Sequence, residues 1–433
     1  MPSTRSLIRQ GSANILRTRM KKPIILLLIC GCVVMTTIVY FTDVTKLDVK
    51  EIINAKFDVY EIINDVVNVI DDDGLNTEPV ADIRPHGDLL CVWWNFTTST
   101  AQPNDDDATL SVHGTVGYSK FVFDHVAHWN GFISGSFSVD NTSFPALVAY
   151  RQLYKCNPIY EKTVRTHIVW WRLNSTCDSD YVMNGMEEAA SNMTGINSCD
   201  LADYEGIFKN SKMSTIYKAN AMRNIARIGA QTDIQLIADI ENHFCDNASI
   251  IASKFADDVR NGTAVVVRRF EYSDTVEVPR NISALDDLFK KQLAFEFHHF
   301  YYKWGHEVPH LKEWVKYSIN PENPTSLDPV KYRSNIWEPQ LIVHRDHPYH
   351  HERVPFGYSD QAVLPHVVCR AGIEFKVGSH IFSGHRSIRR RKSYNSRRNK
   401  EGNAGYAKTV GRAYEKELAQ KYPNTTKRCG KWA

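Results

Sequence analysis

The sequence predicts an α/β domain with a mainly parallel sheet flanked by helices, preceded by a transmembrane helix and a spacer. Three observations support this organisation. Apolar strand-like runs alternate with amphipathic helical runs between about residues 88 and 385. Nineteen residues without a charge stand at 23–41. Eight Asn-x-Ser/Thr sequons follow this uncharged segment, and none precedes it.

The uncharged segment at residues 23–41 is long enough to cross the core of a bilayer as a helix. A buried core helix rarely lacks a polar face, and a cleaved signal peptide has a shorter apolar region followed by small residues. Residues 1–22 contain Arg and Lys but no Asp or Glu, whereas acidic residues follow the segment. The positive-inside rule therefore predicts a cytosolic tail at residues 1–22 and a luminal chain after residue 41.

The sequons agree with this orientation, because N-glycosylation takes place on the luminal side. They are Asn95, Asn141, Asn174, Asn192, Asn247, Asn261, Asn281 and Asn424. Of the nine cysteines, two lie in the predicted span, which leaves seven in the oxidising lumen, where disulfides form. Because seven is odd, at least one cysteine is free or bridges to another molecule. The sequence does not assign the pairs.

Residues 42–86 are interpreted as a luminal stem that holds the folded domain away from the membrane. They contain two similar short stretches, at residues 49–54 and 59–64, and then an acidic run. The domain is expected at residues 87–433 and ends in a basic tail. The net charge of +3 does not indicate nucleic acid, and a luminal location argues against it. Anionic glycans or nucleotide phosphates remain as partners for the tail.

Five apolar runs are predicted to be strands of the domain. They are residues 131–139, 167–173, 233–240, 263–272 and 340–344. A helix is predicted at residues 217–230, where apolar residues recur at helical spacing and Gly229 is suited to ending the helix. A helix that leads into a buried strand is part of a βαβ element, which favours parallel pairing.

The strand at residues 233–240 leads into Asp239 and Glu241, two carboxylates separated by one residue. Open α/β sheets bind their ligands at the carboxyl ends of strands. Carboxylates there suit Mn²⁺ or Mg²⁺, which would neutralise a departing diphosphate. The same spacing also occurs elsewhere, as in Asp203-Tyr204-Glu205, and the alternative for Asp239 is a solvated strand end, so the strand context carries the argument.

A series of motifs, in the same order along the chain, resembles glycosyltransferase family 49. The motifs are His113-Gly114-Thr115-Val116, Trp129-Asn130-Gly131, residues 220–226, residues 265–271, Trp337-Glu338-Pro339, Glu352-Arg353, Phe356-Gly357-Tyr358, Phe382-Ser383-Gly384-His385, and residues 414–418, 421–424 and 428–429. The resemblance covers about residues 111–429.

This resemblance implies a GT-A fold, which is a Rossmann-like mixed sheet flanked by helices. It implies a UDP-sugar donor, Mn²⁺ or Mg²⁺ as cofactor, a glycan or glycoprotein acceptor, and inversion at the anomeric carbon. Glucuronic acid is the first candidate for the sugar. A type II membrane protein of the Golgi apparatus with a luminal catalytic domain is expected, and a homodimer is compatible with it.

The resemblance also implies site residues, each with a structural alternative. The implied metal ligands are Asp239, Glu241 and His385. Donor contacts are implied for His113, Thr115, Arg223, Asn224 and Asp239. Asp360, at the start of a helix predicted at residues 361–368, is the implied base for the acceptor hydroxyl. The alternatives are a surface histidine at 385, a carboxylate at 360 favoured by the helix dipole, and structural roles for Arg223 and Asn224.

Three features depart from the family pattern. Glu241 stands where a second Asp is usual, the region of Phe356-Gly357 is about one residue shorter, and Ser359-Asp360 replace an Asn followed by Lys or Arg. These departures motivate a rival hypothesis, a catalytically silent glycan-binding or chaperone-like relative. A third hypothesis keeps the mechanism and changes the sugar to xylose, N-acetylglucosamine or galactose.

Overall fold

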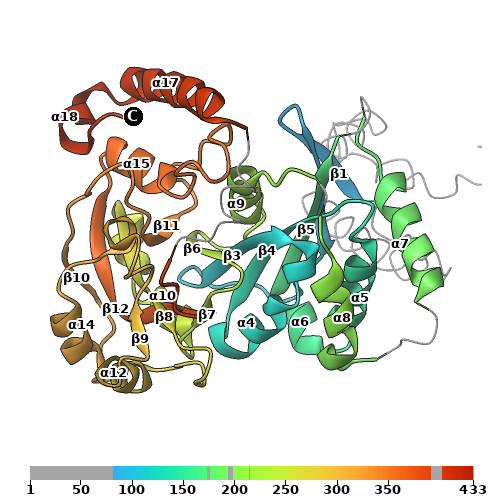
Figure 1. Ribbon diagram of the computed structural model, residues 1–433, viewed down its shortest axis with the longest axis horizontal. Helices are drawn as coiled ribbons and strands as arrows, with labels where there is room; N and C mark the ends of the chain where they lie inside the picture. The colour runs from blue at the N-terminus through green and yellow to red at the C-terminus, as the bar shows by residue number, and fades with distance from the viewer. Residues whose placement is uncertain (1–80, 173–175, 194–197, 214, 392–401, 433) are drawn as a thin grey trace, which may run out of the picture. The chain divides into compact units, whose positions relative to one another are not determined.

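The computed structural model describes residues 81–172, 176–193, 198–213, 215–391 and 402–432 (Figure 1). The predicted cytosolic tail and membrane span, and all but the last few residues of the predicted stem, lie outside these ranges. Among the helices in the described ranges, none combines the length and the apolar character that a membrane span requires. Residues 81–433 form a compact unit of their own.

Twelve strands of the described chain form one sheet. Their order in space is β1-β2-β5-β4-β3-β6-β11-β8-β12-β10, with β7 paired to β12 and β9 paired to β8. The strands are β1 Asp82–His86, β2 Leu90–Thr97, β3 Ala108–Thr115, β4 Phe132–Ser138, β5 Val164–Trp171, β6 Ile234–Asp239, β7 His243–Phe244, β8 Thr263–Tyr272, β9 Ala294–Glu296, β10 Ser326–Pro329, β11 Gln340–His344 and β12 Glu374–Arg386.

The helices lie along the sheet and at its ends (Figure 1). Those in the described ranges are α4 Phe121–Trp129, α5 Phe144–Lys155, α6 Pro158–Thr163, α7 Asp180–Asn192, α8 Glu205–Asn210, α9 Ala219–Ile228, α10 Ala248–Ser253, α11 Ala256–Arg260, α12 Ile282–Lys290, α13 Lys303–His306, α14 Leu311–Ser318, α15 Val363–Arg370, α17 Ala404–Lys421 and α18 Thr426–Cys429.

Strand directions in the sheet are more mixed than the apolar pattern predicts. Within the described strands, only the pairs β3–β4, β4–β5, β3–β6 and β8–β12 are parallel. The prediction of a mainly parallel sheet is therefore wrong, whereas the mixed sheet flanked by helices that the family resemblance implied is confirmed. Apolar alternation reports which face of a strand is buried, and it carries no information about strand direction.

Most predicted elements are found close to their expected limits. β8 and β11 have the predicted ends, and β4, β5 and β6 differ from prediction by three residues or fewer. The helix predicted at 217–230 is α9, and the one predicted at 361–368 is α15, with Pro365 in its first turn, where a missing N–H is tolerated. β1 pairs with β2, so residues 82–86, predicted as the end of the stem, belong to the sheet.

Both faces of the sheet are covered around β2, β4 and β5. Val92 of β2 clusters with Ile225 of α9, whereas its neighbour Cys91 joins the larger core on the other face. Alternate side chains of a strand point to opposite faces, so α9 covers one face here. On the other face, Phe137 of β4 packs edge-on against Tyr150 of α5.

The polar side of α9 is covered by residues 345–360, the segment that follows β11. Arg227, in the last turn of α9, donates a hydrogen bond of 2.8 Å to the carbonyl of Pro348. One turn earlier, Asn224 donates to the carbonyl of His350, also at 2.8 Å. The segment therefore runs along the helix and brings the chain from the last residue of β11 back to the other end of the strands, where β11 begins.

Three disulfides close loops in the domain, Cys91–Cys177, Cys156–Cys199 and Cys369–Cys429. The remaining cysteine of the described chain, Cys245, is buried and free. The expectation that some of the seven cysteines after the predicted span pair and at least one does not is confirmed. The third disulfide fastens α18 to α15 and thereby ties the C-terminal helices to the sheet.

Candidate active site

The candidate site lies where the central strands of the sheet end, and this line of strand ends is called the edge below. β3, β6, β8 and β12 all end at this edge, because β3 is parallel to β6, β8 is parallel to β12, and β11 is antiparallel to both β6 and β8. β11 therefore begins at the edge where the others end, and its first residue, Gln340, pairs with Val267 of β8. The carboxyl ends of strands are the usual ligand-binding positions of open α/β sheets.

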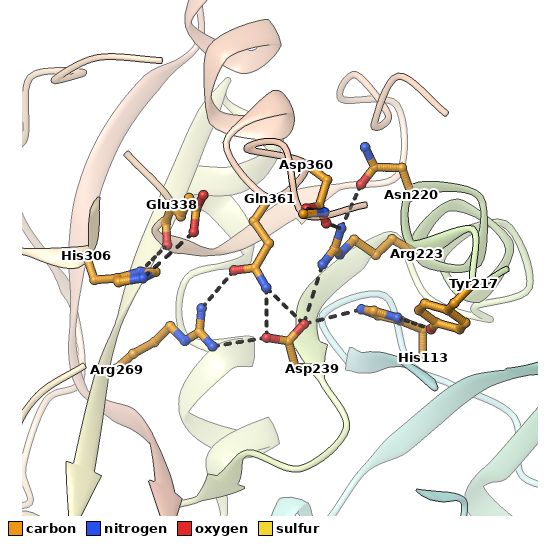
Figure 2. Close-up of polar contacts among 11 residues, drawn as sticks. His113, Tyr217, Asn220, Arg223, Asp239, Arg269, His306, Glu338, Asp360 and Gln361 are labelled. Carbon is orange, nitrogen blue, oxygen red and sulfur yellow. Dashed lines mark hydrogen bonds and ion pairs between the residues drawn. The ribbon is translucent and has the colours of Figure 1, made fainter. Parts of the chain in front are cut away.

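Asp239, the last residue of β6, is the centre of the polar contacts (Figure 2). Its carboxylate lies 3.1 Å from Arg269 and 3.6 Å from Arg223, and accepts a hydrogen bond of 3.0 Å from Gln361. His113, its register partner on β3, places Nε2 at 3.4 Å. Burial alone would raise the pKa of Asp239, but the neighbouring imidazole and guanidinium groups hold it well below the usual range. The carboxylate is therefore charged.

His113 is fixed from behind by Tyr217, whose hydroxyl lies 2.5 Å from Nδ1. Burial lowers the pKa of His113, so its ring is neutral. Thr115, two residues further along, is the last residue of β3 and is partly buried. Within the described residues, no hydrogen bond joins Thr115 to Asp239. The structure thus brings His113 to the carboxylate and leaves Thr115 at the rim of the site.

Arg223 of α9 lies between Asp239 and Asp360 (Figure 2). Its Nη1 donates to Asp360 Oδ2 at 2.8 Å and to Asn220 Oδ1 at 2.7 Å. The other oxygen of Asp360 accepts a hydrogen bond of 2.8 Å from the Gly357 N–H. Asp360 stands just before α15, is 6% exposed, and has a partner on each carboxylate oxygen.

Asn224 does not reach the carboxylate cluster. Its amide nitrogen donates to the carbonyl of His350 and to Glu352 Oε1, both at 2.8 Å, and its oxygen accepts from the His350 N–H at 3.0 Å. These contacts hold the segment that covers α9.

Glu241 and His385 flank Asp239 without joining its hydrogen bonds. Glu241 lies in the turn after β6, where burial and the charge of Asp239 raise its pKa. His385 stands on β12 opposite Glu271 of β8, and burial lowers its pKa to about 4. Its Nδ1 is buried and has no hydrogen-bond partner among the described residues.

The chemistry of Asp239, Glu241 and His385 fits a divalent cation. Two carboxylates supply hard oxygen ligands, and a neutral imidazole supplies a nitrogen without a partner. Their arrangement is less favourable: in the described part of the chain, no three His, Cys, Asp or Glu side chains form a group that could hold a metal. Arg269 and Arg223 already lie against the central carboxylate.

A small cavity adjoins this cluster and is lined in part by Asp239, Arg269 and Gln361. Its volume is about 40 Å³, whereas small-molecule sites commonly measure about 300–1,000 Å³. This cavity by itself is too small for a ligand the size of a sugar nucleotide.

Arg269 and Gln361 were not identified from the sequence. Arg269 interrupts the apolar run of β8 with a charge on the face shared with Glu271, and such an interruption in a buried strand is a usable signal. Gln361 offers no comparable signal, because it precedes α15 in a turn. It contacts both Asp239 and Arg269, the latter at 3.2 Å.

Polar side chains gathered at the carboxyl ends of strands, with arginines among them, are typical of α/β proteins that bind phosphate-bearing ligands. The chain is of this class. Comparison with protein families makes the assignment specific. The chain belongs to glycosyltransferase family 49, described as glycosyl-transferase for dystroglycan, and the match covers residues 107–423.

The curated relatives are named beta-1,4-glucuronyltransferase 1. The human protein is 28% identical over 222 residues, which are 49% of this chain and 50% of the relative, and the Pongo abelii protein gives the same values. The mouse protein is 23% identical over 363 residues, which cover 78% of this chain and 81% of the relative. The chain thus spans about half the length of the human and Pongo abelii relatives in these matches.

Proposed function

We propose that this protein transfers a sugar from a UDP-sugar to a glycan or glycoprotein acceptor, with inversion at the anomeric carbon. Membership of family 49 over residues 107–423, with the acidic strand end at Asp239 inside that range, is the observation that carries the proposal. The name shared by the relatives makes glucuronic acid the first donor to test. Xylose, N-acetylglucosamine and galactose are the alternatives.

In the proposed reaction the acceptor oxygen bonds to the anomeric carbon, and the bond from that carbon to the diphosphate breaks, so that UDP leaves with the electron pair. Asp239, Glu241 and His385 would hold Mn²⁺ or Mg²⁺, which supplies positive charge to the leaving diphosphate when bound. Arg269 and Arg223 keep Asp239 ionised and are placed to meet a phosphate once they leave that carboxylate.

The remaining donor contacts are proposed for the end of β3. His113 and Thr115 lie on the same face of this strand, next to the end of β6. A neutral His113 can donate or accept a hydrogen bond to a sugar or ribose hydroxyl. Asn224 acts indirectly, because it holds the segment that leads to Asp360.

A second candidate, a catalytically silent glycan-binding relative, is favoured by one specific observation. The carboxylate expected to bind metal is in contact with two arginines, and the adjoining cavity is about 40 Å³. A protein that had lost turnover would need no space there. The two candidates differ in whether a UDP-sugar is consumed.

The test uses the purified full chain in detergent, a panel of UDP-sugars, and Mn²⁺ or chelator. The transferase proposal predicts metal-dependent UDP release with one sugar, lost in Asp239→Ala and kept in Asp203→Ala. Asp203 is a matched control, because it opens the same acidic-x-acidic spacing in an exposed position. Glycan binding without UDP release would favour the silent relative. Absence of both would refute the two candidates together.

We further propose that the protein is a single-pass type II protein of the Golgi membrane, with residues 1–22 in the cytosol, a span at 23–41 and a luminal domain. The charge asymmetry around the uncharged segment and the sequons support this topology. Six sequon asparagines are exposed, Asn141, Asn192, Asn247, Asn261, Asn281 and Asn424. In intact vesicles the domain should resist added protease and shift in mobility after glycosidase treatment. Light scattering of the purified chain measures whether it is a homodimer.

A further inference from the structure

We propose that Glu338 takes the proton from the acceptor hydroxyl. The family resemblance implied Asp360 for this role. This inference rests on the proposed transferase function and adds a catalytic residue to it. It follows from the position of Glu338, from the state of its carboxylate, and from the contacts that already engage Asp360.

The position of Glu338 follows from the direction of β11. Glu338 stands two residues before this strand, at the edge where β6 and β8 end. The antiparallel pair Gln340–Val267, continued by two residues, sets Glu338 level with Arg269 on β8. The pairing of β11 with β6, continued in the same way, sets Glu338 level with the residue after Asp239. Figure 2 shows its side chain on the same side of the cluster as Gln361 and Arg269.

The backbone of Glu338 is held firmly on both sides. Its N–H donates a hydrogen bond of 2.6 Å to the Gly305 carbonyl, and its own carbonyl lies 3.2 Å from His306 Nδ1. A carbonyl can only accept, so Nδ1 of His306 carries the ring proton. Burial lowers the pKa of His306 to about 3, and the ring is therefore neutral. The preceding residue, Trp337, is fully buried and anchors the motif.

The carboxylate of Glu338, in contrast, is available. Its side chain is 14% exposed, and within the described ranges no hydrogen bond reaches it. Among the described residues, the one basic group within 4 Å of it is His306 Nε2 at 3.8 Å, which is beyond hydrogen-bond distance. This nitrogen bears a lone pair rather than a proton and lies 3.0 Å from His298 Nδ1. His306 therefore holds the backbone carbonyl of Glu338 and, being neutral, forms no ion pair with its carboxyl group.

Asp360 is poorly suited to the same role. Arg223 and the Gly357 N–H each bond one of its oxygens at 2.8 Å. Protonation of Asp360 would break a buried ion pair and leave less negative charge to balance the buried guanidinium of Arg223. Asp360 is better suited to positioning Arg223 beside Asp239 than to accepting a proton.

The charges around Glu338 make it a stronger base than an ordinary carboxylate. Burial raises its pKa to about 8, and the charges of Asp360 and Asp239 add to this, while Arg269 and Arg223 oppose it. The groups that face it are Asp360 before α15, Asp239 on β6, Arg269 on β8, Arg223 on α9 and neutral His306 on α13. A base whose pKa lies near the working pH is effective in proton transfer.

The proposed step conserves atoms and charge. As the acceptor oxygen bonds to the anomeric carbon, its O–H bond breaks and the proton passes to a carboxylate oxygen of Glu338. The bond to the diphosphate breaks at the same time, and UDP leaves with its electrons. Glu338 then releases the proton to solvent. Only ionised Glu338 can act, so the rate should rise with pH up to about 8.

The experiment compares Glu338→Gln, Glu338→Asp, Asp360→Asn and a control, Glu374→Gln, in the purified full chain with the UDP-sugar that the wild type uses. Glu374 is an exposed residue at the far end of β12. We expect Glu338→Gln to lower kcat about 100-fold or more at unchanged UDP affinity, and to remove the rise of kcat with pH. Glu338→Asp should keep partial activity with the rise moved to lower pH. Glu374→Gln should match the wild type.

Each other outcome has a defined meaning. If the wild type turns over no UDP-sugar, the proposed function fails. If the wild type is active and Glu338→Gln equals it, only the assignment of Glu338 is overturned. Loss of UDP affinity along with kcat would make Glu338 a donor contact instead. Loss of the pH-dependent rise in Asp360→Asn but not in the Glu338 variants would return the role to Asp360. If Glu338→Gln does not fold, Glu338→Asp decides through the shift of its pH profile.

Discussion

Arg269 of β8 reaches Asp239 of β6 across the amino end of β11, the strand that separates them, and ends 3.1 Å from its carboxylate. The guanidinium also lies over the ring of Phe297, 4.1 Å from its centre. Since Asp239 is the first of the proposed metal ligands, this ion pair competes with any cation that binds there. Arg269 therefore stabilises the charge of Asp239 and at the same time blocks access to it.

Replacement of Arg269 should make metal binding easier. In Arg269→Gln the carboxylate loses its nearest cation, and we expect Mn²⁺ to bind about five- to tenfold more tightly, a gain of about 1 kcal/mol. Titration calorimetry of the full chain measures this. Arg268→Gln is the matched control, since Arg268 donates to the carbonyls of Val308 and Pro309 on the other face of β8. Equal or weaker Mn²⁺ binding in Arg269→Gln would contradict the competition.

The buried pair of Arg223 and Asp360 should be costly to break. The side chains are 4% and 9% exposed, and Arg223→Gln leaves the carboxylate of Asp360 without a cation. We expect a loss of about 3–5 kcal/mol in the free energy of unfolding. The double variant Arg223→Gln/Asp360→Asn should recover part of it, because neither charge is then left alone. Chemical denaturation measures both, and a double variant less stable than the single one would disprove the pairing.

The disulfide Cys369–Cys429 should matter for activity more than its effect on stability suggests. It fastens α18 to α15, the helix that begins just after Asp360. Replacing both cysteines by Ser should cost about 2–4 kcal/mol and also lower sugar transfer, because α15 loses a support. The same change at Cys91–Cys177 is the control for stability alone. Thermal unfolding and turnover, measured side by side, separate the two effects, and equal turnover in both variants would count against the idea.

Stability should pass through a maximum as pH changes. Burial lowers the pKa of His125 to about 4 and of His167 and His306 to about 3, so their contribution is present above pH 6.5 and is lost as pH falls through those values. Burial raises the pKa of Glu271 to about 7 and of Glu338 to about 8. Their contribution is complete below about pH 4.5 and is lost as pH rises through 7 and 8.

The two trends together place the highest melting temperature at about pH 6–7. Glu271→Gln removes one titrating group, so the melting temperature of the variant should gain on that of the wild type as pH rises from about 4.5 to 7. Thermal unfolding of the wild type and the variant from pH 4.5 to 9 measures this. Parallel curves between about pH 4.5 and 7 would show that Glu271 does not contribute.

Some parts of the fold and site follow from local sequence, and others depend on distant contacts. The apolar runs of β8 and β11 have sharp ends, so their limits are predictable. Asp239 is found because it ends such a run. The role proposed for Glu338 depends on β11 running against its neighbours, which side-chain alternation does not encode. The partner of Asp360, Arg223, is 137 residues away, and no local pattern links them.

The contact between α9 and the segment that follows β11 limits how this site can be exchanged between relatives. Successive parts of residues 345–360 accept hydrogen bonds from Arg227, Asn224 and Arg223 of α9. The distance between these donors along the helix is set by the helical rise of about 1.5 Å per residue. Near the end of this segment, the backbone at Gly357 and Ser359 has positive φ angles of 82° and 58°. A chimera that takes only the helix or only the segment from a relative would set each side chain against the wrong partner. The two pieces can be transplanted only as a unit.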